Sequence, residues 1–132
     1  MRILGFSKKW DKLQNDVFTT FRFPRKDKDW QVGEVVQIVY KPRSKEREVL
    51  GIAEIVYLWG RHFGFCTNIT DKEAVLDGFS GYTVMKDCFY KMYGDIIFDR
   101  PINKLTLKWL TSSEFQKREA SVIELGGDEE EK

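Results

Sequence analysis

Basic residues stand beside tryptophans at three places in the chain, and this combination is suited to binding RNA. Lys9 precedes Trp10, the segment RKDKD precedes Trp30, and Trp59 stands two residues before Arg61. Proteins bind single-stranded RNA by stacking its bases on aromatic rings and by pairing its phosphates with cations. Because tryptophans of a small domain are more often packed in the core, we expect only one or two of the four to contact a ligand.

The densest positive charge lies in the segment KPRSKER at residues 41–47, which has four basic residues and one acid. Its proline and serine are typical of a loop. A basic loop is expected on a surface that binds phosphate, and a loop whose charges are merely solvated is the alternative. The whole chain has 22 Lys and Arg against 21 Asp and Glu, so its net charge of +1 is too small for a protein that coats DNA.

The C-terminal segment GGDEEEK, residues 126–132, contains four acids, one base and no apolar side chain. Such a segment cannot bury surface, so we expect a disordered acidic tail after a single domain of residues 1–125. The tail either keeps the protein soluble or binds a basic protein partner. Without it, the domain is more basic than the net charge of the whole chain indicates.

Arg22 is a further candidate for ligand binding. Alternation along a strand places Arg22 on the same face as Phe18 and Thr20. A guanidinium in such a position must reach solvent or pair with a carboxylate or a phosphate. The partner is therefore either a ligand from outside the chain or an internal acid, with Asp77 and Glu54 as the candidates.

Several classes of site are excluded by residue types that are rare or absent. His62 is the only histidine, which removes HExxH metalloproteases and sites built from several imidazoles. Cys66 and Cys88 form no CxxC motif, so we expect neither a zinc site nor a disulfide framework. The chain has no GxGxxG or Walker sequence, so we expect no cofactor. We expect His62 to be a packed or surface residue, with contact to a base as the alternative.

The apolar residues are too dispersed for a membrane protein. No run approaches the ~18 apolar residues of a membrane span, and the first residues lack the long apolar run of a secretory signal. We therefore expect a cytoplasmic protein that does not contact membranes. A chain of 132 residues is long enough to bury one core, and we expect a monomer.

The apolar periodicity predicts an α+β fold in which strands dominate. Thr70 and Glu73 have the spacing of a capping box that begins a short helix, and the stripe of Met85, Phe89 and Tyr93 predicts a longer, packed helix. Few connections look parallel, so we expect a small mixed β-barrel with short helices on its rim. The predicted order is strand 3–6, helical turn 7–13, strand 16–23, hairpin strands 32–40 and 48–57, helices 70–78 and 85–93, strand 103–110, and a last short helix capped by Ser113.

The order of elements and several local sequences resemble the ASCH domain, a branch of the PUA-like fold. The resemblance spans roughly residues 3–110 and is carried by DVFTTFRF, WQVGEVVQIVY, ITDKEAVLDGF, MKDCFYKMYG and KLTLKWL. It implies a PUA-like barrel with a basic cleft that binds RNA or a nucleotide. Because one fold hosts many activities, the fold follows from this resemblance more directly than the function does.

The ASCH resemblance also has a motif, G-x-K-x-x-E-x-R, or its variant with Thr in the place of Glu, at the start of the first long strand. Here Arg22 matches the arginine and Thr20 matches the threonine of the variant, whereas Asn15 replaces the glycine and Val17 replaces the lysine. The cleft predicted from this resemblance and from the basic segments binds its ligand through Lys9, Trp10, Thr20, Arg22, Arg61 and Asp77.

A second function implied by the resemblance is amide hydrolysis of a modified nucleoside such as N4-acetylcytidine. In ASCH enzymes of that kind the working groups are the motif lysine, the threonine and a carboxylate before the second helix. The threonine corresponds here to Thr20 as nucleophile, and the carboxylate corresponds to Asp77 as acid or base. A threonine hydroxyl needs a base or a cation beside it, which Val17 cannot supply. Lys9 or Lys12 would have to reach the cleft from the preceding turn, so a binding module is favoured over an enzyme.

Overall fold

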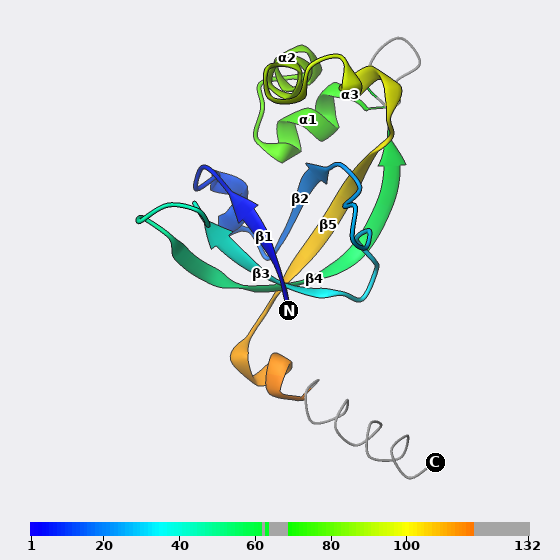
Figure 1. Ribbon diagram of the computed structural model, residues 1–132. Coiled ribbons are helices and arrows are strands. Elements are labelled where there is room, and N and C mark those ends of the chain that lie inside the picture. Colours follow the sequence, from blue (N-terminus) through cyan, green and yellow to red (C-terminus); the bar gives the residue numbers. More distant parts are fainter. Residues whose placement is uncertain (62, 64–68, 118–132) are drawn as a thin grey trace, which may run out of the picture.

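Five strands form one curled sheet in the computed structural model, which describes residues 1–61, 63 and 69–117 (Figure 1). Their order across the sheet is β1-β3-β4-β5-β2. β1 runs parallel to β3, and every other neighbouring pair is antiparallel. The strands are β1 (Arg2–Phe6), β2 (Val17–Arg22), β3 (Val35–Tyr40), β4 (Glu48–Arg61) and β5 (Ile102–Leu110).

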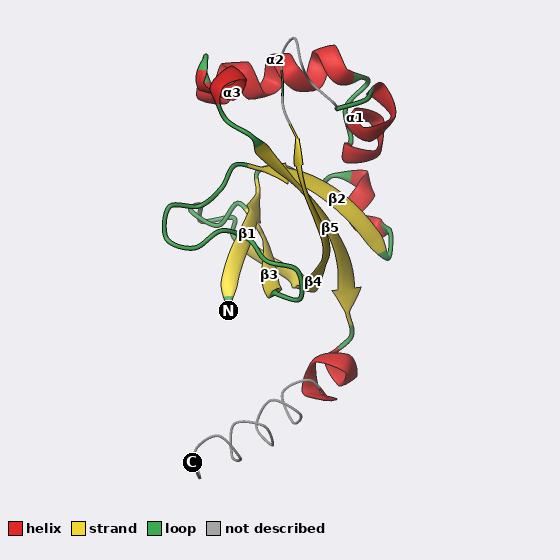
Figure 2. Ribbon diagram, turned by 90° about the vertical axis from the view of Figure 1, so that its right-hand side faces the viewer, coloured by secondary structure: helices red, strands yellow, loops and turns green. Residues whose placement is uncertain are grey.

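Three helices gather at one end of the sheet, where β2 ends and β5 begins (Figures 1 and 2). They are α1 (Asp71–Asp77), α2 (Tyr82–Tyr93) and α3 (Ile96–Asp99), and a 3-10 turn at Asp11–Gln14 connects β1 to β2. Residues 112–117 form a helical turn beyond the opposite end of the sheet. No helix in the described part of the chain is long and apolar enough to cross a membrane.

The α+β class predicted from the sequence is confirmed, and the capping box of Thr70 and Glu73 begins α1 as expected. The hydroxyl of Thr70 accepts a hydrogen bond from the Glu73 amide at 3.1 Å, and the Glu73 carboxylate accepts one from the Thr70 amide at 3.1 Å. The last short helix has a different cap from the one predicted. The amide of Glu114 donates to Thr111 Oγ1 at 3.1 Å, so Thr111 caps this turn and Ser113 does not.

The two sheet edges, β1 and β2, are not hydrogen-bonded to each other in the described part of the chain, so the sheet is open there. Their side chains nevertheless share one core. The rings of Phe6 on β1 and Phe18 on β2 lie 6.3 Å apart and pack with Leu4, Ile38 and other buried residues. The curled sheet is therefore held together across its open side by apolar packing.

A second core lies between the sheet and the helices. Phe21 of β2 packs there with Met85 and Phe89 of α2. Phe18 and Phe21 belong to different cores because successive side chains of a strand point to opposite faces. The end of β2 thus lies where the interior of the sheet meets the helical layer. Residues 62, 118–125 and the predicted acidic tail at 126–132 lie outside the described part of the chain.

The edge strand β1 is held in place by a bidentate ion pair. Arg2 donates from Nε and Nη2 to the two carboxylate oxygens of Glu34, each at 2.6 Å. The Arg2 guanidinium also lies 4.5 Å from the ring of Trp30, which is buried. Hydrogen bonding to Arg2 lowers the pKa of Glu34 below its ordinary value of 4.5.

We expect Glu34→Gln to lower the free energy of unfolding by about 1 kcal/mol, because the exchange removes one charge from a partly buried pair. The pKa of Glu34 is lower in the folded chain than in the unfolded one, so its contribution is present above pH 4.5 and is lost as the pH falls through the folded value. Urea unfolding of both proteins across this range measures the difference. A difference that does not change with pH would contradict the assignment.

Candidate functional site

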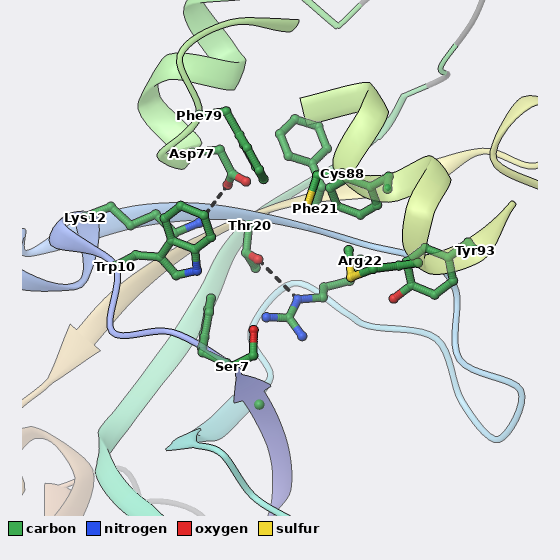
Figure 3. A pocket seen from close by; sticks show the side chains of 14 residues that line it. Ser7, Trp10, Lys12, Thr20, Phe21, Arg22, Asp77, Phe79, Cys88 and Tyr93 are labelled. Carbon is green, nitrogen blue, oxygen red and sulfur yellow. Dashed lines mark hydrogen bonds and ion pairs between the residues drawn. The ribbon is translucent and has the colours of Figure 1, made fainter. Parts of the chain in front are cut away.

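A pocket of about 270 Å³ opens where the end of β1, the end of β2 and the helices α1 and α2 meet (Figure 3). It lies on the open side of the sheet, next to the two unpaired edges. Its polar side chains are Ser7, Lys12, Thr20, Arg22 and Asp77. Its walls are largely aromatic and include Phe6, Trp10, Phe79, Phe89 and Tyr93.

Lys12 and Asp77 form a buried ion pair at one side of this pocket. Lys12 Nζ lies 2.9 Å from Asp77 Oδ1, and the two side chains are 6% and 5% exposed. The hydroxyl of Thr19 also donates to Oδ1, at 3.4 Å. Asp77 Oδ2 makes no hydrogen bond with any residue that the structure describes, so one carboxylate oxygen is unused.

Local structure brings this lysine and this acid together. Lys12 lies in the 3-10 turn between β1 and β2, and Asp77 is the last residue of α1. Gly78 ends α1 in the left-handed conformation, with φ of 112°. A β-carbon at this position would lie 2.5 Å from the ring of Trp10. Glycine therefore lets the end of α1 approach the tryptophan that precedes the turn.

Burial acts against both charges of the Lys12–Asp77 pair. It raises the pKa of Asp77 above the ordinary 3.8 and lowers the pKa of Lys12 below the ordinary 10.5, while the attraction between the two groups opposes both shifts. The nearby cation of Arg22 lowers both pKa values. A buried pair of this kind adds little to stability compared with apolar side chains in the same space. Its position in a pocket points to a role in binding or chemistry.

Arg22 faces the same pocket, and no acid among the described residues forms an ion pair with it. Its Nε donates to Thr20 Oγ1 at 3.1 Å, and its guanidinium lies 4.6 Å from the ring of Phe6. The structure shows no ion pair of Arg22 with any described residue, so the internal pairing with Asp77 or Glu54 is not found. Burial lowers the pKa of Arg22 from 12.5, yet the group stays charged.

Figure 3 shows that the two terminal nitrogens of Arg22 point away from Thr20 and toward Ser7. Neither nitrogen donates to a residue that the structure describes. Thr20 is 4% exposed and accepts the bond from Arg22, and its own proton has no acceptor among the described residues. The pocket therefore offers two donor nitrogens, the hydroxyls of Ser7 and Thr20 and one carboxylate oxygen to a ligand.

Four of the six residues predicted for the cleft line this pocket, namely Trp10, Thr20, Arg22 and Asp77. Lys9 and Arg61 lie elsewhere. Lys9 is exposed and pairs with Glu48 at 2.7 Å. Arg61 pairs with Glu73 at 3.1 Å, and its guanidinium lies 4.8 Å from the ring of Trp59. Of the two lysines considered for the cleft, Lys12 is the one that the turn places there.

The three tryptophans that stand beside basic residues differ in exposure. Trp30 is 6% exposed and belongs to the core, whereas Trp59 is 53% exposed on β4. Trp10 lies between these extremes and is the tryptophan that forms a wall of the pocket. His62, the other candidate for base stacking, lies outside the described part of the chain.

Ser7, Phe79 and Tyr93 line the pocket and were not predicted as site residues. The sequence holds a signal for Tyr93, because it continues the apolar stripe of α2 while carrying a hydroxyl. Phe79 follows the glycine that ends α1, and its ring lies 5.3 Å from that of Trp10. Nothing in the sequence pattern distinguishes Ser7 from a helix cap.

Within the described part of the chain, no group of three or more His, Cys, Asp and Glu side chains is arranged to hold a metal ion. Comparisons of the chain with protein-family models, with curated proteins and with solved structures each found no match. The resemblance to the ASCH domain therefore stays a prediction from the sequence.

We expect Lys12→Met to lower the free energy of unfolding by about 3–5 kcal/mol at neutral pH, because it leaves the carboxylate of Asp77 buried without its cation. This loss of stability becomes smaller as the pH falls, because folding raises the pKa of Asp77 above 3.8 and so favours its protonated form. Urea unfolding followed by tryptophan fluorescence measures both effects.

The matched control is the double variant K12M/D77L, which replaces the pair by apolar side chains. We expect its stability to lie within about 1 kcal/mol of the natural chain, or above it, because burial opposes both charges. A double variant that loses as much stability as Lys12→Met would show that the ion pair itself holds α1 against the turn.

Proposed function

We propose that this chain is an RNA- or nucleotide-binding module of the ASCH type, and that the ligand binds in the pocket at Arg22. The observation that carries the proposal is the unpaired guanidinium. Arg22 lies half-buried with two nitrogens directed into the pocket and no acid paired with it in the described part of the chain. A planar guanidinium fork is suited to phosphate, carboxylate or carbonyl oxygens of a ligand.

The size and walls of the pocket favour a single base. A volume of about 270 Å³ is near the lower end of the ~300–1,000 Å³ typical of small-molecule sites. The rings of Trp10, Phe79 and Tyr93 lie around it. Stacking of one base on an aromatic ring is worth about 1–3 kcal/mol, so such walls would hold a nucleobase whether it is free or unstacked from an RNA chain.

The PUA-like barrel belongs to the same proposal. The open sheet has β1 and β2 as its edges, and the core shared by Phe6 and Phe18 joins these edges without hydrogen bonds between them. In this interpretation the pocket lies at the mouth of an incompletely closed barrel. Small barrels commonly bind ligands at the mouth.

Amide hydrolysis is a second candidate function, and the Lys12–Asp77 pair favours it. The family motif has a lysine where this chain has Val17, and Lys12 brings an ammonium group to the same pocket from the preceding turn. Burial lowers the pKa of Lys12, which makes its neutral amine more accessible as a base. Thr20 then has a base in its pocket and the cation of Arg22 on its oxygen.

The hydrolysis would proceed in two steps. Thr20 Oγ1 attacks the acetyl carbonyl of N4-acetylcytidine while its proton passes to a base, and the cytosine amine leaves with a proton. Water then cleaves the acetyl ester, which releases acetate and restores the hydroxyl. The unused oxygen of Asp77 is placed to accept a proton or to orient the water.

We expect Arg22→Ala to weaken binding of a labelled single-stranded RNA about tenfold or more at low salt, because the pocket loses its unpaired fork. Lys45→Ala removes one exposed charge from the loop after β3 and borders neither the pocket nor Arg22, so it is expected to weaken binding by about twofold or less. Fluorescence anisotropy against a panel of short RNAs measures both. Equal losses from the two variants would show that the pocket is not the binding site.

If the chain hydrolyses N4-acetylcytidine, Thr20→Ala is expected to abolish release of acetate, and Thr20→Ser to retain part of it, because serine keeps the nucleophilic oxygen. Lys12→Met is expected to lower kcat more than KM, since the amine acts in the chemical step. Acetate release is measured directly on the folded variants. Turnover that Thr20→Ala leaves unchanged would reject this mechanism.

A further inference from the structure

A second concavity, of about 500 Å³, adjoins the pocket at Arg22. The two share Gly5, Phe6, Ser7 and Arg22, and the second is completed by residues 41–44 of the loop between β3 and β4. The two concavities therefore form one groove, with aromatic walls on one side of Arg22 and the basic loop on the other. Nothing in the site described above uses the side of the groove at this loop.

The loop is fixed against β1 before any ligand binds. The amide of Lys41 donates to the carbonyl of Phe6 at 2.8 Å, and the amide of Ser44 closes a turn on the carbonyl of Lys41 at 3.0 Å. Pro42 packs directly over Gly5, where a β-carbon would lie 2.7 Å from Pro42 Cγ. A preformed loop binds a ligand without first losing conformational entropy.

Some of the charged side chains of the loop already have partners within the chain. Lys41 pairs with Glu46 at 2.8 Å, and Arg47 donates to the carbonyl of Pro42 at 3.2 Å. Arg43 is exposed and makes no hydrogen bond or ion pair within the described part of the chain. The groove thus presents two guanidinium groups that have no acid partner among the residues described, Arg22 from β2 and Arg43 from the loop.

We propose that this side of the groove is a phosphate subsite, formed by Arg43 and Arg22 with the hydroxyl of Ser7, and that the ligand is a nucleotide and not a nucleoside. This inference rests on the function proposed above. One carboxylate would satisfy a single guanidinium, whereas a phosphate has the charge and the oxygens to pair with both. A nucleotide carries a base and a phosphate joined by a ribose, which matches aromatic walls and a basic loop on opposite sides of Arg22.

The test compares nucleosides with their 5′-monophosphates on the full chain. Adenosine, cytidine, guanosine, uridine and N4-acetylcytidine are titrated in both forms, by isothermal calorimetry at low salt. The dinucleotide CpC, whose only phosphate joins two nucleosides, represents the phosphate within an RNA chain. We expect the monophosphate to bind at least about tenfold more tightly than its nucleoside. Arg43→Ala is expected to remove most of this gain and to leave nucleoside affinity unchanged within about twofold.

Lys45→Ala is the matched control, because it removes a charge from the same loop and borders neither concavity. A gain in affinity from the phosphate that is lost in Arg43→Ala and kept in Lys45→Ala supports the subsite, and CpC that binds more tightly than cytidine shows that the phosphate of an RNA chain also reaches it. Equal losses of this gain in both variants would indicate diffuse attraction and overturn the subsite. Nucleosides and monophosphates that bind equally overturn the subsite and leave the proposed function standing. No binding of the nucleosides, the monophosphates, CpC or the short RNAs overturns both.

Discussion

The site depends on how the guanidinium of Arg22 is kept half-buried without an ion pair to any acid that the structure describes. Arg22 has the ring of Phe6 on one side and the hydroxyl of Thr20 on the other. Both contacts are weaker than an ion pair, so the cation keeps most of its capacity to bind an anion. Neighbouring charges do not remove that capacity, because the nearby carboxylate of Asp77 already pairs with Lys12.

The open side of the sheet leaves space in front of Arg22. If β1 and β2 were hydrogen-bonded to each other, the end of β2 would be covered and Arg22 would have no space in front of it. Here the two edges meet through Phe6 and Phe18, and the gap beside them is bordered by α1, α2 and the loop after β3. The close approaches of Trp10 to Gly78 and of Pro42 to Gly5 fix the two sides of this gap. Rigid supports of this kind suit a site that must be formed in advance.

Local rules predicted much of the fold and part of the site. Alternation along β2 places Thr20 and Arg22 on one face, and the capping box and Gly78 define α1 and thus the position of Asp77. Sequence could not decide between Lys9 and Lys12, because a 3-10 turn has no fixed pattern of buried positions. Sequence could not show that Arg61 pairs with Glu73 either, because Glu73 comes from a helix whose approach to β4 depends on tertiary packing. α3, Ile96–Asp99, is too short to show a helical period.

Direct contact between the ligand and the Arg22 guanidinium can be observed by proton–nitrogen NMR of the arginine Nε–Hε groups during titration with a 5′-monophosphate, with the Arg22 signal assigned from Arg22→Lys. We expect the Arg22 signal to change saturably at the concentration where calorimetry detects binding. Saturable binding that leaves the Arg22 signal unchanged would show that the ligand lies elsewhere on the molecule and not at Arg22.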